Sequence, residues 1–361
     1  MKSAYHSDGL LHARGLAALA VVGAHYELGP YVERVTSLPL GFVAISGNYS
    51  VFFFFALSGY LMAKILTETY SDNIGQYYFN RLARIAPTYY LAVILPVIVT
   101  GFVFVPADHW HVLIFNAEHA NVWVKGYAGN GILWSLSVEM KFYALAPLLF
   151  LLSQRLRHLP MALFILGAFF KYWHYQRFGS IELPYRHQYF ALDGNLVYMM
   201  AGWVAYQYRR EIPRISVNAA LALFVAVLLA IWSYHANNLV TTNQFATKAW
   251  TLAIPAALCA VALVTLPSLD QHSDNRFLHF LGVTSFAVFA IHMPFKHTLD
   301  MPIPAKLAIV YLIAYGVYHF FERPLFALRR DHKAPPFQVQ PIAEPGPVLR
   351  PTDTPGIQPQ K

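Results

Sequence analysis

Long runs of apolar residues, separated by short polar connections, make up most of the chain. Ten of these runs approach or exceed the roughly 20 residues that a helix needs to cross a bilayer. They lie at about 10–29, 41–65, 86–106, 131–152, 159–175, 189–207, 216–235, 249–267, 278–296 and 304–324. The pattern predicts an all-α, polytopic membrane protein with about ten transmembrane helices.

The basic residues predict how these helices are oriented. Ten spans put both termini on one side, together with four connections: 66–85, 153–158, 208–215 and 268–277. These connections are rich in arginine, and the opposite side holds a sparser set, with the stretch 171–188 as the exception. Because cytoplasmic loops carry an excess of Lys and Arg, we expect both termini in the cytoplasm.

The composition also indicates a membrane protein and excludes several kinds of site. The chain is 57% hydrophobic and 12% charged, whereas soluble domains carry about 25% charged residues. The net charge of +8 does not indicate nucleic acid, because the basic residues lie in short clusters between apolar runs. The single cysteine, Cys259, excludes an internal disulfide, and no metal site is expected. Repeated prolines predict a disordered tail at 331–361, after a transmembrane domain at 1–330.

The first run contains two ionisable residues, Arg14 and His25. Their spacing places them within about 20° of one helix face and about 16 Å apart along the axis. Ionisable groups inside a membrane helix usually face a protein interior or a wet cavity, which makes both functional candidates. The structural alternative is an arginine that extends to the headgroups and a histidine satisfied by a neighbouring helix.

A second pair of cations, Arg81 and Arg84, precedes the third run. Their i,i+3 spacing places them on one helix face, and Pro87 fits the start or a kink of the helix that follows. Paired guanidinium groups suit phosphate oxygens. Arginines at a helix end can also serve only as topology signals. Arg14, expected at similar depth on the same side, favours an anion site.

The fourth run places Glu139 on one helix face with Ser135 and Tyr143. Counting residues along each helix puts Glu139 at a depth comparable to that of His25, toward the outer side. We therefore expect Glu139 to pair with His25 and to orient it as a general base. A purely structural pair is the alternative.

Two further residues are candidates. His292, near the end of the ninth run, is a second potential base, although His25 has the better placed carboxylate. Ser58 stands beside Gly59, and small residues permit close approach of helices. A nucleophilic role for Ser58 would need an adjacent base, and none is visible in the local sequence.

Six segments, in order, resemble the acyltransferase 3 family of membrane-bound O-acyltransferases over essentially all of residues 10–325. They are RGLAALAVVGAH, FFFFALSGYLM, FNRLARIAPTYY, LWSLSVEMKFYALAP, LGVTSFAVFAIH and FERP. The resemblance implies a ten-helix fold and transfer of an acyl group, often acetyl, from cytoplasmic acyl-CoA to a hydroxyl. It also implies functional roles for Arg14 and His25 in the first helix, and for Trp134 and Glu139 in the fourth.

The resulting hypothesis has three parts. Arg14, Arg81 and Arg84 bind the phosphates of acyl-CoA, and His25, oriented by Glu139, is a general base or carries the acyl group transiently. The resemblance implies that the acceptor is a sugar of a surface polysaccharide, lipid-linked glycan or glycolipid. There are two alternatives. The acceptor is a small molecule such as a macrolide, or the protein is a proton-coupled transporter and not an acyltransferase. We expect the protein in the lipid bilayer of a bacterial inner membrane.

Overall fold

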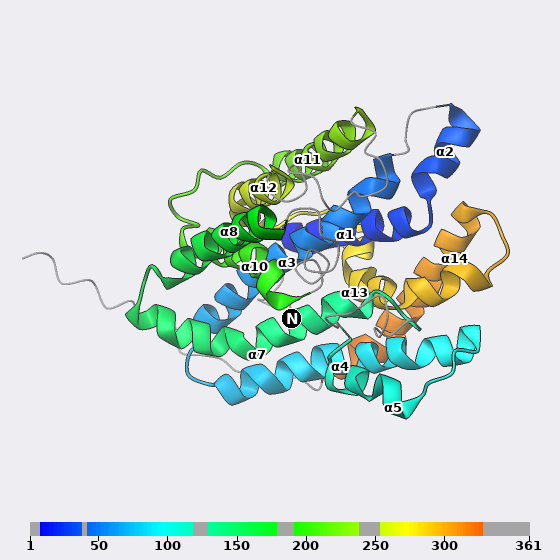
Figure 1. Cartoon of the computed structure of the whole chain (residues 1–361), viewed down its shortest axis with the longest axis horizontal. Coiled ribbons are helices and arrows are strands. Elements are labelled where there is room, and N and C mark those ends of the chain that lie inside the picture. Colours follow the sequence, from blue (N-terminus) through cyan, green and yellow to red (C-terminus); the bar gives the residue numbers. More distant parts are fainter. Residues whose placement is uncertain (1–7, 38–41, 118–128, 179–190, 238–252, 328–361) are drawn as a thin grey trace, which may run out of the picture.

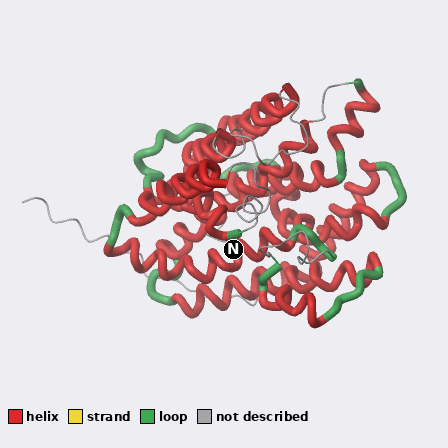
Figure 2. The backbone as a smooth tube through the Cα atoms, in the orientation of Figure 1, coloured by secondary structure: helices red, strands yellow, loops and turns green. Residues whose placement is uncertain are grey.

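The computed structural model describes residues 8–37, 42–117, 129–178, 191–237 and 253–327, and these residues form helices joined by loops, with no strand among them (Figure 2). The helices of the first half are α1 (Asp8–His25), α2 (Leu28–Thr36), α3 (Phe42–Glu68), α4 (Ile74–Thr100), α5 (Pro106–His109), the 3-10 helix η1 (Trp110–Ile114) and α7 (Leu133–Arg155). Those of the second half are α8 (Leu159–Phe178), α10 (Leu192–Gln207), α11 (Val217–Asn237), α12 (Ile254–Leu269), α13 (Arg276–Thr298), α14 (Ile303–Gly316), η3 (Val317–Glu322) and α15 (Arg323–Ala327).

Helical structure is present at each of the ten predicted runs. Within the described residues, five helices are long and apolar enough to cross a bilayer: Tyr49–Glu68, Ile74–Thr100, Leu133–Arg155, Arg276–Lys296 and Ile303–Phe326. Shorter apolar helices occur in α8, α11 and α12. The chain is therefore an all-helical, multi-pass membrane protein. Ten spans and cytoplasmic termini stay predictions, and the predicted tail at 331–361 lies outside the described residues.

Helices α1 and α3 form the centre of the molecule (Figure 1). On one side α1 packs against α13, and on the other α3 packs against α10, which also contacts α8 and α12. Helices α4 and α7 run side by side along the lower edge in Figure 1 and contact α13 and α3 respectively. The first helix, which carries two of the predicted functional residues, is thus enclosed by the bundle.

The closest helix contact involves small residues, as the sequence predicted for Ser58 and Gly59. A Cβ atom added to Gly59 would lie 1.8 Å from the carbonyl oxygen of Met199 on α10. From the opposite helix, a Cβ atom on Gly202 would lie 1.7 Å from the carbonyl oxygen of Ala56. Glycine at both positions lets the two backbones touch, and this contact fixes the position of Ser58.

The first predicted run is divided into two helices. Helix α1 ends at His25, Glu27 follows in the left-handed region with φ 56°, and α2 begins at Leu28. His25 therefore stands at the end of its helix rather than a full turn inside it. A run of apolar residues does not report such a turn, because the break lies in backbone dihedral angles.

The third predicted run begins earlier than expected. Helix α4 starts at Ile74, where the side chain of Asn73 accepts a hydrogen bond from the Gln76 backbone N–H at 2.9 Å. Asparagine at this position is a standard helix start signal. Pro87 accordingly lies inside α4 and does not start it.

The last predicted run contains a change of helix type. After α14, the π-helical segment η3 leads into α15. Within η3 the buried carboxylate of Glu322 accepts a hydrogen bond from Thr88 of α4 at 2.9 Å. This bond holds the end of the candidate span Ile303–Phe326 against α4.

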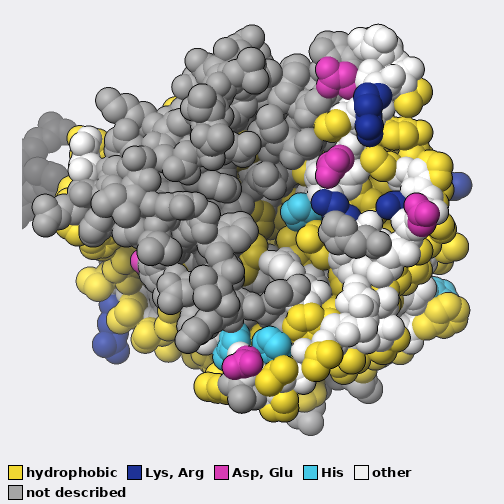
Figure 3. Space-filling model, turned by 45° about the vertical axis from the view of Figure 1, so that its right-hand side comes forward, with side chains coloured by type: hydrophobic (Ala, Val, Ile, Leu, Met, Phe, Trp, Pro, Cys, Tyr) yellow, Lys and Arg dark blue, Asp and Glu magenta, His cyan; other side chains and the backbone are white. Residues whose placement is uncertain are grey.

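The outer surface is strongly apolar. Hydrophobic side chains cover much of the described part of the face in Figure 3. The most exposed large ones include Ile98, Leu312 and Phe320, the last with 81% of its surface accessible. Such exposure is unfavourable in water and natural in lipid, which agrees with a membrane location.

Candidate active site

A cavity of about 350 Å³ lies among α1, α3, α4, α7, α13 and α15. Its wall follows α3 from Val51 to Ile65, which corresponds to roughly 21 Å of helix, and continues to Thr69 just beyond the end of α3. Seven of the ten residues proposed from the sequence line it: Arg14, Ser58, Arg81, Arg84, Ser135, Glu139 and Tyr143. The cavity is thus built by segments far apart in the sequence.

The cavity is positively charged. Its charged lining residues, within the described part of the chain, are three arginines and one glutamate. The guanidinium of Arg14 lies 5.7 Å from the centre of the Phe286 ring, and that of Arg84 lies 5.4 Å from the Phe326 ring. The Nε atom of Arg81 is buried and has no hydrogen-bond partner among the described residues. A buried donor without a partner is unfavourable, and an anion in the cavity would satisfy it.

Arg81 and Arg84 owe their placement to α4. Because both lie within this helix at i,i+3 spacing, both face the cavity from the same side. Phe326, from the short helix α15, lines the cavity beside Arg84. The last helix that the structure describes therefore contributes to the cationic end.

Glu139 forms a compact polar cluster with two hydroxyl groups. Ser58 donates a hydrogen bond to Oε1 of Glu139 at 2.6 Å, and Tyr143 donates to Oε2 at 3.2 Å. The two hydroxyl oxygens are 3.0 Å apart. Arg14 and Arg84 are near enough for their charges to act on the carboxylate. The cluster lies directly in the cavity wall, and it supplies the adjacent carboxylate that the local sequence around Ser58 did not show.

The prediction that His25 pairs with Glu139 is wrong. Glu139 bonds Ser58 and Tyr143, while His25 bonds another histidine. The prediction compared depths along two helix axes, and equal depth does not fix which helices are neighbours. Helix α1 faces α13 most extensively, so the residue opposite His25 comes from α13.

His25 pairs with His292. Nδ1 of His25 lies 2.8 Å from Nε2 of His292, and the two rings are stacked with an angle of 15° between their planes. His292 is fully buried, whereas His25 is partly exposed. The hydroxyl of Tyr26 donates to the backbone carbonyl of His292 at 2.7 Å, which ties the end of α1 to α13.

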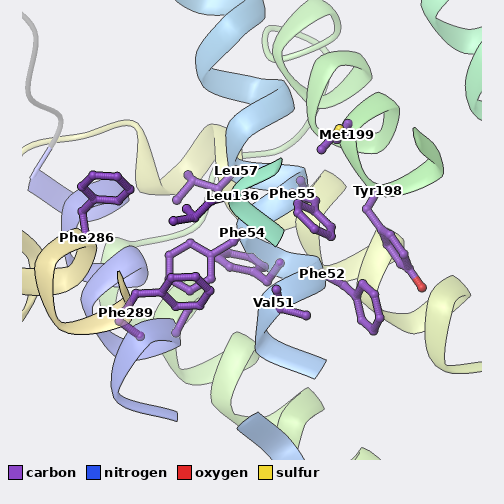
Figure 4. Close-up of a cluster of buried hydrophobic side chains, with 14 of the residues drawn as sticks. Val51, Phe52, Phe54, Phe55, Leu57, Leu136, Tyr198, Met199, Phe286 and Phe289 are labelled. Carbon is purple, nitrogen blue, oxygen red and sulfur yellow. The ribbon is translucent and has the colours of Figure 1, made fainter. Parts of the chain in front are cut away.

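Phe289, together with its neighbour Phe54, lines the part of the cavity that lies nearest to His292. The rings of Phe54 and Phe289 lie beside each other with centres 5.5 Å apart (Figure 4). Both line the cavity, and the Phe289 ring lies 6.2 Å from that of His292. Neither histidine belongs to the cavity lining. The histidine pair therefore lies beyond the apolar end of the cavity, away from the arginines.

Trp134 and Ser135 have structural contacts. The ring of Trp134 packs edge-on against Phe55 with centres 6.0 Å apart and does not line the cavity. Ser135 lines the cavity, and its hydroxyl donates to the carbonyl of Ile132 at 2.9 Å. In the described residues no cluster of three or more His, Cys, Asp or Glu could hold a metal ion.

Comparison with known proteins identifies the family. Residues 8–324, nearly the whole chain, match the family described as the acyltransferase domain, Acyl_transf_3. The chain belongs to the acyltransferase 3 family. It is thus an enzyme of acyl transfer, and the cavity and histidine pair described above are the candidate parts of its active site.

Individual relatives of this acyltransferase carry similar names. A candidate membrane-bound transacylase of Komagataeibacter xylinus, BcsY, is 26% identical over 80% of this chain and 71% of its own length. A candidate O-acetyltransferase of Staphylococcus aureus strain COL is 23% identical over 86% of this chain, and only 56% of its own length is covered. A candidate acetyltransferase of the Acidianus two-tailed virus is 25% identical over 80% of this chain and 83% of its own length. No solved structure matches the chain.

Sequence reasoning missed four residues of this acyltransferase that surround the site: Tyr26, Phe54, Phe289 and Phe326. For Tyr26 the signal was its position next to His25. The three phenylalanines look like many other apolar residues in their runs, so periodicity alone does not distinguish them. Only the mutual arrangement of α3, α13 and α15 shows their place.

Proposed function

We propose that this acyltransferase uses acyl-CoA as the donor, and that the acyl group is acetyl. The observation that carries the proposal is the cavity itself, with arginines at one end and aromatic side chains at the other. Coenzyme A combines phosphates with a long, mostly uncharged arm. Arg14, Arg81 and Arg84 would bind its phosphates through charge-assisted hydrogen bonds, and the arm would follow the apolar wall toward Phe54 and Phe289.

In this proposal the acceptor is a hydroxyl group that His25 activates. His25 takes the proton of the hydroxyl, and the hydroxyl oxygen attacks the thioester carbonyl. The carbon–sulfur bond then breaks, and the departing thiolate receives the proton. Alternatively His25 carries the acyl group between donor and acceptor. In this mechanism Glu139 does not orient His25, because the two side chains do not contact each other. It holds the hydroxyls of Ser58 and Tyr143 at the cavity wall and balances part of the arginine charge.

The acceptor that we propose is a sugar of a cell-surface polysaccharide, a lipid-linked glycan or a glycolipid. Support comes from the resemblance described above and from the O-acetyltransferase names of the staphylococcal relatives. We further propose that the enzyme lies in a bacterial inner membrane with about ten spans and with the arginine end of the cavity on the cytoplasmic side. The distribution of basic residues supports this orientation.

The test is transfer of radiolabelled acetyl from acetyl-CoA in membranes that contain the wild type, His25→Ala, Arg14→Ala or Arg276→Ala. Arg276 is exposed and outside the cavity, so its variant is the matched control. We expect label in a glycan or lipid fraction with the wild type and the control, and none with the other two at equal protein levels.

The same assay separates the alternatives. Label in an added macrolide, but in no glycan or lipid, would replace the acceptor that we propose. Unchanged transfer by His25→Ala would refute the role of His25. Absence of turnover with any short-chain acyl-CoA, together with proton-coupled flux into vesicles, would overturn the proposed function in favour of a transporter.

A further inference from the structure

The backbone around His292 determines which of its ring nitrogens carries hydrogen. Nδ1 of His292 lies 2.8 Å from the carbonyl oxygen of Phe289 and 3.0 Å from that of Val288. A carbonyl oxygen only accepts hydrogen bonds, so this nitrogen must be the donor. With hydrogen on Nδ1, the Nε2 atom of a neutral His292 holds a lone pair.

This lone pair in turn determines the state of His25. Nε2 of His292 is 2.8 Å from Nδ1 of His25, and it can only accept in the neutral ring. Nδ1 of His25 is therefore the donor, and Nε2 of His25 is left with the free lone pair. A general base needs such a lone pair, and in this state Nε2 is the one ring nitrogen of His25 that has it.

The charges near the pair favour the neutral state of His292. A protonated His292 could donate from Nε2 and would reverse the direction of the bond. Among the described residues, the formal charge that acts on both histidines is that of Lys296, which is itself positive and pairs with Glu27 at 3.7 Å. No carboxylate in the described part of the chain contacts His292, and its ring is fully buried. Burial of an unpaired charge is very unfavourable, so His292 is neutral.

We propose that His292 is a positioning residue that fixes the tautomer of His25 and directs Nε2 of His25 to the acceptor hydroxyl. The inference rests on the proposed function, because it assigns a role within acyl transfer. When the acceptor gives its proton to Nε2 of His25, the imidazolium keeps its Nδ1–H bond to His292. That bond then becomes charge-assisted and stabilises the transition state. The proton later passes from His25 to the departing thiolate, which leaves both rings in their starting state.

The first test compares two variants of His292 by steady-state kinetics of acyl transfer. His292→Phe keeps a ring but removes the acceptor, whereas His292→Gln can present an amide oxygen to Nδ1 of His25. A lost hydrogen bond to a charged group is worth about 1.5–3 kcal/mol, so His292→Phe should lower kcat roughly 10- to 150-fold. The KM for acyl-CoA should change little, because His292 does not line the cavity. His292→Gln should recover most of kcat.

The control variant is Arg276→Ala, on the same helix α13 as His292 but exposed and outside the cavity. We expect it to keep kcat and the KM for acyl-CoA. Equal losses of kcat for His292→Phe and His292→Gln would show that His292 only fills space, and would overturn the inference.

A second measurement does not depend on activity. Nitrogen-15 NMR of histidine-labelled protein reports which ring nitrogen carries hydrogen, and the signals of His25 are identified by their loss in His25→Ala. We expect hydrogen on Nδ1 of His25 and a bare Nε2. Hydrogen on Nε2 would overturn the inference even if the enzyme is active. If wild type transfers no acyl group, the proposed function fails, and the NMR result still decides the tautomer.

Discussion

Replacement of Gly59 by alanine tests the arrangement that holds the site together. Gly59 follows Ser58 on α3 and faces α10, where an added Cβ atom would lie 1.8 Å from the carbonyl oxygen of Met199. Ordinary contacts of a Cβ atom begin near 3.4 Å, so the added methyl group falls about 1.6 Å short of the room that it needs. The obstacle is backbone, which cannot swing away as the end of a side chain can.

The energetic cost follows from this geometry. Overfilling a well-packed core typically costs about 1–3 kcal/mol, and a clash with backbone belongs at the upper end of that range. Alanine is favoured over glycine in a helix by about 1 kcal/mol, which offsets part of the loss. We therefore expect Gly59→Ala to lower the free energy of unfolding by about 2 kcal/mol. Because α3 must move away from α10, Ser58 also moves relative to Glu139, and acyl transfer should fall.

The assay measures the apparent melting temperature of detergent-purified protein. Samples are heated, and unfolding is recorded as the loss of the monodisperse peak in size-exclusion chromatography. Gly316→Ala is the matched control, because its added Cβ atom meets nothing within 4 Å. We expect Gly316→Ala to melt at or above the wild-type temperature and Gly59→Ala to melt several degrees lower. If both variants melt together, the close contact of α3 and α10 is not as described and the reasoning fails.

Three further substitutions test the roles of charged side chains. Arg81→Ala should raise the KM for acyl-CoA about 10- to 100-fold in the transfer assay, whereas Arg276→Ala should not, since only the former removes a group that we propose binds phosphate. Glu139→Gln should tighten binding of free coenzyme A in calorimetry, because it removes the cavity's negative charge. Hydrogen bonds to Asp8 and Asp274 raise the pKa of the exposed His272, so these contacts are present at low pH and should be lost as the pH rises above the raised pKa. Asp8→Asn should reduce the accompanying drop in melting temperature.

The helical character of the fold was largely predictable from the sequence, because lipid solvation demands long apolar runs and helical structure is present at each of the predicted runs. Helix ends were less predictable. Asn73 was a readable start signal for α4, and the expectation placed more weight on Pro87. The break after His25 depends on the left-handed conformation of Glu27, which apolar patterning does not report.

The sequence predicted most residues of the site, but not which of these residues contact one another. Spacing along a helix placed Arg81 beside Arg84 and Glu139 beside Tyr143, and the structure has both pairs facing one cavity. Spacing along one helix does not predict which residues of two helices contact each other. The predicted pairing of His25 with Glu139 rested on depth alone, and His292 was considered only as an alternative base. The rotation of the helices and the identity of their neighbours place His292 beside His25 instead.

The arrangement along α1 has a consequence for the chemistry that we propose. Arg14 lines the cavity at one level of this helix, and His25 lies at its end, about 16 Å further along the axis. Phe289, which lines the cavity and contacts Phe54, has its ring centre 6.2 Å from that of His292. In the chemistry that we propose, the acyl end of the donor therefore has to extend past the Phe289 ring to meet a hydroxyl that His25 activates, while its phosphates stay at the level of Arg14.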